Sequence, residues 1–200
     1  MQQLLFVNAC PRGEASRTLC LARSFLEELS RQGDLRIVTQ DLPSLGLRSM
    51  DADALAVKEA LCDRCVWDDS FFRHALPFQQ ADAVVIAAPY WDLSFPSILK
   101  VWVENMYVRN LTFRYEADRC VGLCRGREAV YITTAGSPIG TNDWGALYIR
   151  AVMNALGIPG FTSVRAEGLD LAGNDAAAIM AQAETSARKA ARELAIRLGA

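Results

Sequence analysis

Short apolar runs alternate with longer amphipathic stretches along the whole chain. The apolar runs have the length and composition of buried strands, and we expect five strands, at residues 4–7, 35–39, 83–88, 129–134 and 161–165. The amphipathic stretches repeat their apolar residues at the spacing of one helix face, for example at positions 19, 22, 25, 26 and 29. This spacing predicts helices at residues 17–31, 51–65, 68–80, 98–107, 143–156 and 176–198.

The alternation of strands and helices predicts an α/β fold with a single doubly wound, five-stranded parallel sheet. Helices are expected on both faces of this sheet, because parallel strands are joined by crossover connections. Residues 1–200 contain no internal repeat, low-complexity segment or long linker, so we expect one domain. The pattern alone leaves the strand order open between 2-1-3-4-5 and the Rossmann order.

Composition excludes several classes of protein. Hydrophobic residues make up 52% of the chain and charged residues 22%, which excludes a disordered protein. The formal net charge of -2 does not favour nucleic acid or an anionic membrane as a partner. Because no apolar run reaches membrane-spanning length and no signal segment is recognised, we expect a cytoplasmic protein that does not bind membranes.

Six cysteines raise the question of a metal site or disulfides. Cys62 and Cys65 have the spacing C-x2-C, and Cys120 and Cys124 have the spacing C-x3-C. The first pair falls in a predicted helix, where both side chains would lie on one face, and the second lacks the surroundings of a zinc ribbon. We therefore expect small buried residues rather than a metal site, and no disulfides in a cytoplasmic chain.

The loop after the first strand, residues 8–18, has the residue types of a phosphate site. Hydroxyl groups at Ser16 and Thr18 and free backbone amides at a helix start would bind a phosphate. The alternative is that Ser16 only caps the helix. Neither the G-x-G-x-x-G fingerprint nor the P-loop lysine pattern is present.

Two further loops would lie at the same edge of the sheet, because the carboxyl ends of parallel strands meet there. Residues 89–97, between the strand at 83–88 and the helix at 98–107, form an aromatic, proline-bearing loop that would pack on a flat apolar ligand or a partner. Residues 133–141 are small, and Gly136 is free to adopt a positive φ, although a plain connecting loop is an equal alternative. Together the three loops suit a mononucleotide with a planar ring, and FMN fits better than ATP because no Mg²⁺-binding pattern is evident.

The chain resembles the flavodoxin-like NAD(P)H-dependent quinone reductase family, and within it the FMN-dependent NADH-azoreductases. The resemblance covers nearly the whole chain. It rests on Ser16-Arg17-Thr18, on Ala88-Pro89-Tyr90-Trp91-Asp92-Leu93 with Pro96, Leu99 and Lys100, on Leu111-Thr112-Phe113-Arg114-Tyr115, on Val121-Gly122-Leu123 with Gly126, on Ile132-Thr133-Thr134-Ala135-Gly136 and on Ala166-Glu167-Gly168.

The resemblance implies the strand order 2-1-3-4-5 and a homodimer with its flavin sites near the interface. It implies NADH or NADPH as electron donor and a quinone or azo compound as acceptor, in a ping-pong reaction that FMN carries without a protein nucleophile or a metal. Trp91 and Phe113 are candidates for the substrate-binding wall, although Phe113 is equally suited to a core or an interface. The implied cofactor contacts are Cys10, Ser16, Arg17, Thr18, Pro89, Tyr90, Trp91, Asp92, Leu93, Thr134, Ala135, Gly136 and Ser137.

Three positions depart from the family pattern. Cys10 replaces the usual serine, Asp92 replaces the usual asparagine, and Ala135-Gly136-Ser137 stands where a double glycine is common. An ionised carboxylate can only accept hydrogen bonds, so Asp92 at the flavin edge would oppose the anionic reduced flavin. The alternative is that Asp92 caps the helix that starts after Pro96.

Two other functions are weighed against this one. A serine hydrolase needs a histidine, and His74 is the only one; it is expected in the middle of a helix, and no G-x-S-x-G motif is present. A flavin-binding electron carrier or a non-catalytic module of the same fold is the second alternative. Carriers usually have a strongly acidic face, and the net charge of -2 argues mildly against one.

Overall fold

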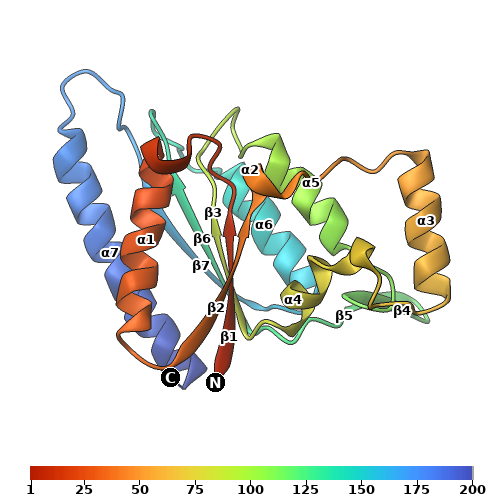
Figure 1. The fold of residues 1–200 in the computed structure, drawn as a ribbon. Coiled ribbons are helices and arrows are strands. Elements are labelled where there is room, and N and C mark those ends of the chain that lie inside the picture. Colours follow the sequence, from red (N-terminus) through yellow and green to blue (C-terminus); the bar gives the residue numbers. More distant parts are fainter. Residues whose placement is uncertain (200) are drawn as a thin grey trace.

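The main sheet has five parallel strands in the order β2-β1-β3-β6-β7 (Figure 1). The computed structural model describes residues 1–199. Counting only the strands of this sheet, the order is 2-1-3-4-5, which confirms the order implied by the resemblance and excludes the Rossmann order. The strands are β1 (Gln2–Asn8), β2 (Leu35–Asp41), β3 (Ala83–Ala87), β6 (Glu128–Thr134) and β7 (Gly160–Ala166).

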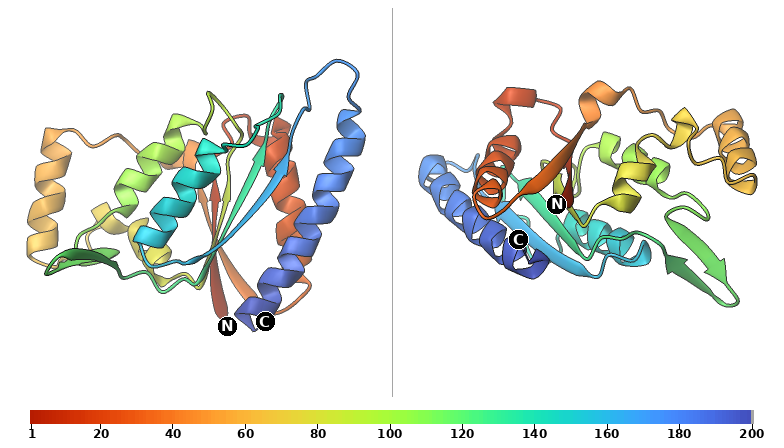
Figure 2. Two further views of the ribbon diagram at one scale, coloured as in Figure 1. Left: turned by 180° about the vertical axis from the view of Figure 1, so that it is seen from behind. Right: turned by 60° about the horizontal axis from the view of Figure 1, so that its bottom comes forward.

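One face of the sheet is covered by α1 (Arg17–Ser30) and α7 (Ala176–Leu198), which lie side by side (Figures 1 and 2). The buried face of α7 is made largely of alanine, including Ala183, Ala187 and Ala191. Small side chains allow α7 to approach α1 and the sheet closely. The predicted helix at 176–198 is therefore confirmed in both position and role.

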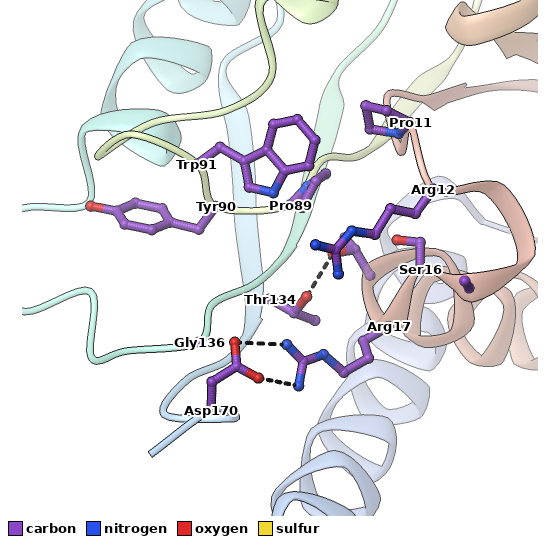
Figure 3. A pocket seen from close by; sticks show the side chains of 12 residues that line it. Pro11, Arg12, Ser16, Arg17, Pro89, Tyr90, Trp91, Thr134, Gly136 and Asp170 are labelled. Atoms are coloured by element: carbon purple, nitrogen blue, oxygen red, sulfur yellow. Dashed lines mark hydrogen bonds and ion pairs between the residues drawn. The ribbon is translucent and has the colours of Figure 1, made fainter. Parts of the chain in front are cut away.

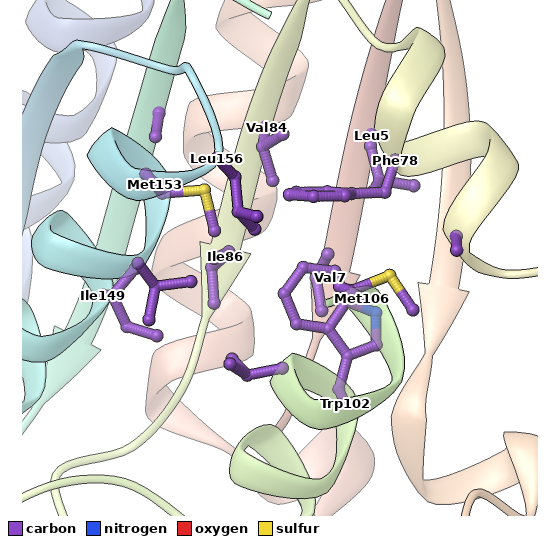
Figure 4. Packing of buried hydrophobic residues seen from close by; sticks show 14 of the residues in the cluster. Leu5, Val7, Phe78, Val84, Ile86, Trp102, Met106, Ile149, Met153 and Leu156 are labelled. Atoms are coloured by element: carbon purple, nitrogen blue, oxygen red, sulfur yellow. The ribbon is translucent and has the colours of Figure 1, made fainter. Parts of the chain in front are cut away.

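The opposite face carries α2 (Leu42–Leu45), α4 (Ala75–Gln80), α5 (Ser97–Met106) and α6 (Trp144–Ala155). Trp102 is the largest fully buried side chain here, and its ring meets Phe78 edge-to-face at 5.3 Å (Figure 4). Its indole N–H donates to Gln40 Oε1 at 2.6 Å, so the buried polar atom is satisfied.

An arm extends from this side of the sheet, formed by α3 (Ala52–Asp63) and a hairpin of β4 (Phe113–Glu116) and β5 (Arg119–Gly122) (Figures 1 and 2). Lys58 on α3 donates to the backbone carbonyl of Glu104 on α5 at 2.9 Å. Arg109, which precedes the hairpin, forms an ion pair with Asp63 at the end of α3. The hairpin was not among the predicted elements, because each of its strands is only four residues long and mixes apolar with charged residues.

Two helix predictions are wrong in detail. The helix expected at 68–80 is broken into a 3-10 turn at Ser70–Phe72 and α4, because Asp69 caps the turn by accepting the N–H of Phe71 at 2.8 Å. His74 therefore lies at the N-cap of α4 and not in the middle of a helix. Helix α3 ends at Asp63, and Cys65 beyond it has φ of 53°, so Cys62 and Cys65 do not share a helix face.

All six cysteines are free thiols. Within residues 1–199 no group of three or more histidine, cysteine or acidic side chains is arranged to hold a metal ion. Among the helices that the structure describes, none combines the length and apolar character needed to cross a membrane.

Candidate functional site

A polar pocket of about 150 Å³ lies at the carboxyl edge of the sheet, between the loops that follow β1, β3, β6 and β7 (Figure 3). Eight of the residues predicted to bind the cofactor line it. These are Ser16, Arg17, Thr18, Pro89, Tyr90, Trp91, Thr134 and Gly136. Four further residues line the pocket and were not predicted from the sequence: Pro11, Arg12, Ala15 and Asp170.

The first loop ends in a helix cap that leaves hydrogen-bond donors free. Ser16 is the N-cap of α1, and its Oγ accepts the backbone N–H of Leu19 at 3.3 Å. The next two backbone amides, of Arg17 and Thr18, donate to no acceptor within residues 1–199. Ser16 is thus a helix cap, as the alternative interpretation predicted. The free amides beside it lie at the positive end of a helix, where anions bind.

Two arginines add positive charge to this side of the pocket. The guanidinium of Arg17 forms a two-pronged ion pair with Asp170, at 2.9 Å and 3.2 Å. This pairing holds the pKa of the Asp170 carboxyl below its usual range, so Asp170 is ionised at neutral pH. The Arg12 side chain forms no ion pair or hydrogen bond within the described part of the chain, and both guanidinium groups extend from the β1–α1 side across the pocket (Figure 3).

Asp170 lies directly against Gly136. The backbone N–H of Asp170 donates to the Gly136 carbonyl at 2.9 Å, and Leu169 makes the matching bond to Ala135 at 3.2 Å. A Cβ on residue 136 would come within 2.2 Å of the Asp170 carboxylate. Gly136 does not have a positive φ, so the expected reason for glycine here is corrected: it is favoured by the close approach of the Asp170 side chain and not by a turn.

An aromatic segment forms the other side of the pocket. Pro89, Tyr90 and Trp91 follow β3, and the Tyr90 N–H donates to the Thr134 carbonyl at 2.9 Å, which fastens this segment to β6. The Trp91 side chain remains 38% exposed, so much of its ring is free to contact a ligand. Partial burial and the nearby carboxylate of Asp143 raise the pKa of Tyr90, which keeps its phenol neutral.

A tight turn at residues 91–94 ends this segment. Trp91 and Ser94 exchange two backbone hydrogen bonds, of 3.3 Å and 2.7 Å, across Asp92 and Leu93. Both central residues have positive φ, 49° and 65°, which a two-residue hairpin turn requires. A left-handed conformation costs leucine about 1–2 kcal/mol, and such strain is typical of functional sites.

Asp92 and Leu93 are exposed at the tip of this turn and do not line the pocket. The alternative role of Asp92 as a helix cap is wrong, because Pro96 is the N-cap of α5 and no side chain caps that helix. Asp92 therefore projects from the rim on the aromatic side.

Four other predicted residues also lie off the pocket surface. Cys10 is fully buried beneath the first loop, and burial raises the pKa of its thiol to about 11. Ala135 is buried and Ser137 is exposed outside the lining. Phe113 lies on the arm, where its ring packs against Tyr107 at 5.7 Å.

His74 lies outside the residues that line this pocket. Its Nε2 accepts a hydrogen bond from the Nε of Arg73 at 2.9 Å, and burial lowers its pKa. Within residues 1–199 no hydrogen bond joins His74 to a serine, so the structure adds no support for a hydrolase.

Comparison with known proteins agrees with this geometry. The model of the family described as "Flavodoxin-like fold" matches residues 2–191. An "FMN-dependent NADH:quinone oxidoreductase 2" of Clostridium acetobutylicum is 35% identical over 201 residues, covering 96% of this chain and all of that protein. A Clostridium beijerinckii protein named "FMN-dependent NADH:quinone oxidoreductase" is 32% identical, covering 96% of this chain and 99% of its own length.

Solved structures show the same fold. An FMN-dependent NADH-azoreductase from Bacillus anthracis str. Ames Ancestor, crystallised in complex with FMN, superimposes with a TM-score of 0.85 at 25% identity. The match covers 98% of this chain and all of that chain. An NAD(P)H:quinone oxidoreductase from Methanothermobacter marburgensis has a TM-score of 0.77 at 20% identity, over 96% of this chain and 98% of its own.

Proposed function

The chain belongs to the flavodoxin-like fold family, and from this premise we propose that it is an FMN-dependent NAD(P)H oxidoreductase that reduces a quinone or an azo compound. The observation that carries the proposal is the pocket at the carboxyl edge of the sheet. It combines an anion site at a helix N-terminus with an adjacent, partly exposed aromatic segment. The names of the relatives support the same cofactor, donor and class of acceptor.

The residues present fit FMN. The free amides of Arg17 and Thr18, together with Arg12, would hold the phosphate at the start of α1. Pro89, Tyr90 and Trp91 would line the ring, and the absence of a side chain at Gly136 keeps the facing loop close. When bound, FMN would supply the redox chemistry, taking hydride from the nicotinamide and passing electrons to the acceptor in a ping-pong sequence.

The protein's own groups bind and orient, and need not react. Tyr90 stays neutral and Cys10 is a buried thiol with a raised pKa, so neither competes as a nucleophile at neutral pH. The backbone of the aromatic segment, which would line the ring, is fixed by the hydrogen bonds from Tyr90 to Thr134 and from Ala88 to Ile132. Fixed dipoles of this kind stabilise developing charge without reorganising. The exposed ring of Trp91 would contact the nicotinamide or the acceptor.

The proposal includes a homodimer. A wide hollow of about 750 Å³ lies between α3, α5 and α6, and it adjoins exposed apolar side chains, with Trp144 56% and Leu147 46% exposed. Apolar area of this kind marks an interface. Phe113 lies on the arm and does not line the pocket of its own subunit, so its predicted contact with substrate would come from a second copy. The cytoplasmic location stays a prediction.

The function is tested on purified protein stripped of flavin. Binding should quench the fluorescence of FMN and raise the unfolding temperature of the protein. The FMN-loaded protein should then oxidise NADH or NADPH when benzoquinone or methyl red is supplied as acceptor. Bound FMN without turnover would support the alternative of a carrier or non-catalytic module. Failure to bind FMN would refute both. Sedimentation at micromolar concentration tests the dimer, and a monomer would contradict it.

A further inference from the structure

The pocket contains a negative charge where a phosphate-binding site is expected to have none. Asp170 lines the pocket and is ionised. Its carboxylate accepts hydrogen bonds from both terminal nitrogens of Arg17. Arg17 is the first residue of α1, so its guanidinium belongs to the same anion site as the free amides. The carboxylate therefore occupies hydrogen-bond donors that an anionic ligand would use.

The segment that carries Asp170 is well anchored, so the side chain can leave Arg17 while the backbone stays in place. The Asp170 N–H is bonded to the Gly136 carbonyl at 2.9 Å. The loop beyond is closed by Asn174, whose side chain donates to the Gly168 carbonyl at 2.8 Å. Arg17 and Asp170 are 40% and 65% exposed, so water can solvate the carboxylate when it is displaced.

We propose that Asp170 is a carboxylate stand-in for the ligand phosphate, and that binding of FMN exchanges the Arg17–Asp170 pair for an Arg17–phosphate pair. This inference rests on the proposed function and adds a residue that sets cofactor affinity. The phosphate of FMN carries nearly two negative charges, so it outcompetes one carboxylate for the planar guanidinium. Displacing Asp170 therefore lowers the binding affinity for FMN but not for riboflavin, which has no phosphate.

Removing the carboxylate charge should therefore tighten FMN. In Asp170→Asn, Arg17 is freed from its ion pair and the repulsion between carboxylate and phosphate is lost. We expect the Kd for FMN to fall about three- to fivefold, the size typical of a partly exposed ion pair, and the Kd for riboflavin to stay unchanged. The gain should shrink as salt is raised, because exposed charges are screened.

Glu14→Gln is the matched control. Glu14 lies in the same first loop and is also paired with an arginine, Arg23, but it does not line the pocket. The substitution removes the same unit of charge from an equivalent ion pair near the site. Its Kd for FMN should match that of the wild type, which separates the specific exchange from a general change in net charge.

The experiment titrates flavin-free wild type, Asp170→Asn and Glu14→Gln with FMN and with riboflavin, following flavin fluorescence at two salt concentrations. Asp170→Ala is a second variant and should show the same gain, and thermal unfolding checks that each protein is folded. Equal or weaker FMN binding in both Asp170 variants would overturn the inference and leave the proposed function standing. If no protein binds FMN, both are overturned.

Discussion

The two sides of the pocket are built in opposite ways. On the α1 side, three polar side chains are paired and only Gly13 has a positive φ: Thr18 and Thr134 share a hydrogen bond of 2.7 Å, Ser16 caps its helix, and Arg17 is held by Asp170. On the aromatic side, Leu93 is left-handed and 68% exposed, and Trp91 is 38% exposed.

This difference indicates which part is complete in one subunit. The α1 side is preorganised for an anion, because the backbone amides of Arg17 and Thr18 are free at the start of α1 and the bond from Thr18 to Thr134 fastens this helix start to β6. The aromatic side keeps strain and apolar surface that a ring or a second subunit would cover.

The first prediction concerns Cys10, beneath the α1 side. Its pKa is about 11 in the folded protein against an ordinary 9.0, so the folded state keeps its proton where the unfolded state has lost it. Stability is therefore fully present below pH 9 and falls as pH rises from 9 to 11, by up to about 2–3 kcal/mol. Urea unfolding of wild type and Cys10→Ala at each pH measures this loss; parallel curves for the two proteins would contradict it.

The second prediction concerns the hydrogen bond between Thr18 and Thr134. Thr18→Val leaves the largely buried hydroxyl of Thr134 without its partner, and should lower the free energy of unfolding by about 1–3 kcal/mol. The double variant Thr18→Val with Thr134→Val should recover part of the loss, because no polar group is then left unpaired. Additive losses in the double variant would show that the bond contributes nothing.

The third prediction tests the strain on the aromatic side. Asparagine tolerates the left-handed conformation better than leucine, so Leu93→Asn should raise the free energy of unfolding by about 1 kcal/mol. Leu93→Ala is the control, because it removes the exposed side chain but keeps the backbone penalty. The idea fails if thermal unfolding shows the same gain for alanine as for asparagine.

The fourth prediction concerns Asp92, at the rim of the aromatic side. Asp92→Asn removes a negative charge and supplies a donor, so it should tighten FMN two- to threefold and raise the flavin reduction potential. The expected change is small, because Asp92 is exposed and its charge is screened by water. Equal affinity and equal potential in the two proteins would place Asp92 away from the flavin edge.

The sequence by itself determined the strands and most helices, because each element carries its own apolar period and β1, β3 and β6 are buried runs. It also placed the first, aromatic and small-residue loops at one edge, because parallel strands end together. Eight of the lining residues followed from these loops and from the resemblance.

Only the tertiary structure decided the rest, because those features depend on residues far apart or on backbone angles. Asp170 meets Arg17 across 153 positions of sequence, and no local pattern predicts such a pair. The burial of Cys10 depends on β3, because its thiol faces the backbone carbonyl of Ala87. The left-handed angles at Asp92 and Leu93 follow from the turn that the hydrogen bonds between Trp91 and Ser94 close. The hairpin strands are only four residues long, too short to carry a clear period, and Arg109 beside them is paired with Asp63 of α3.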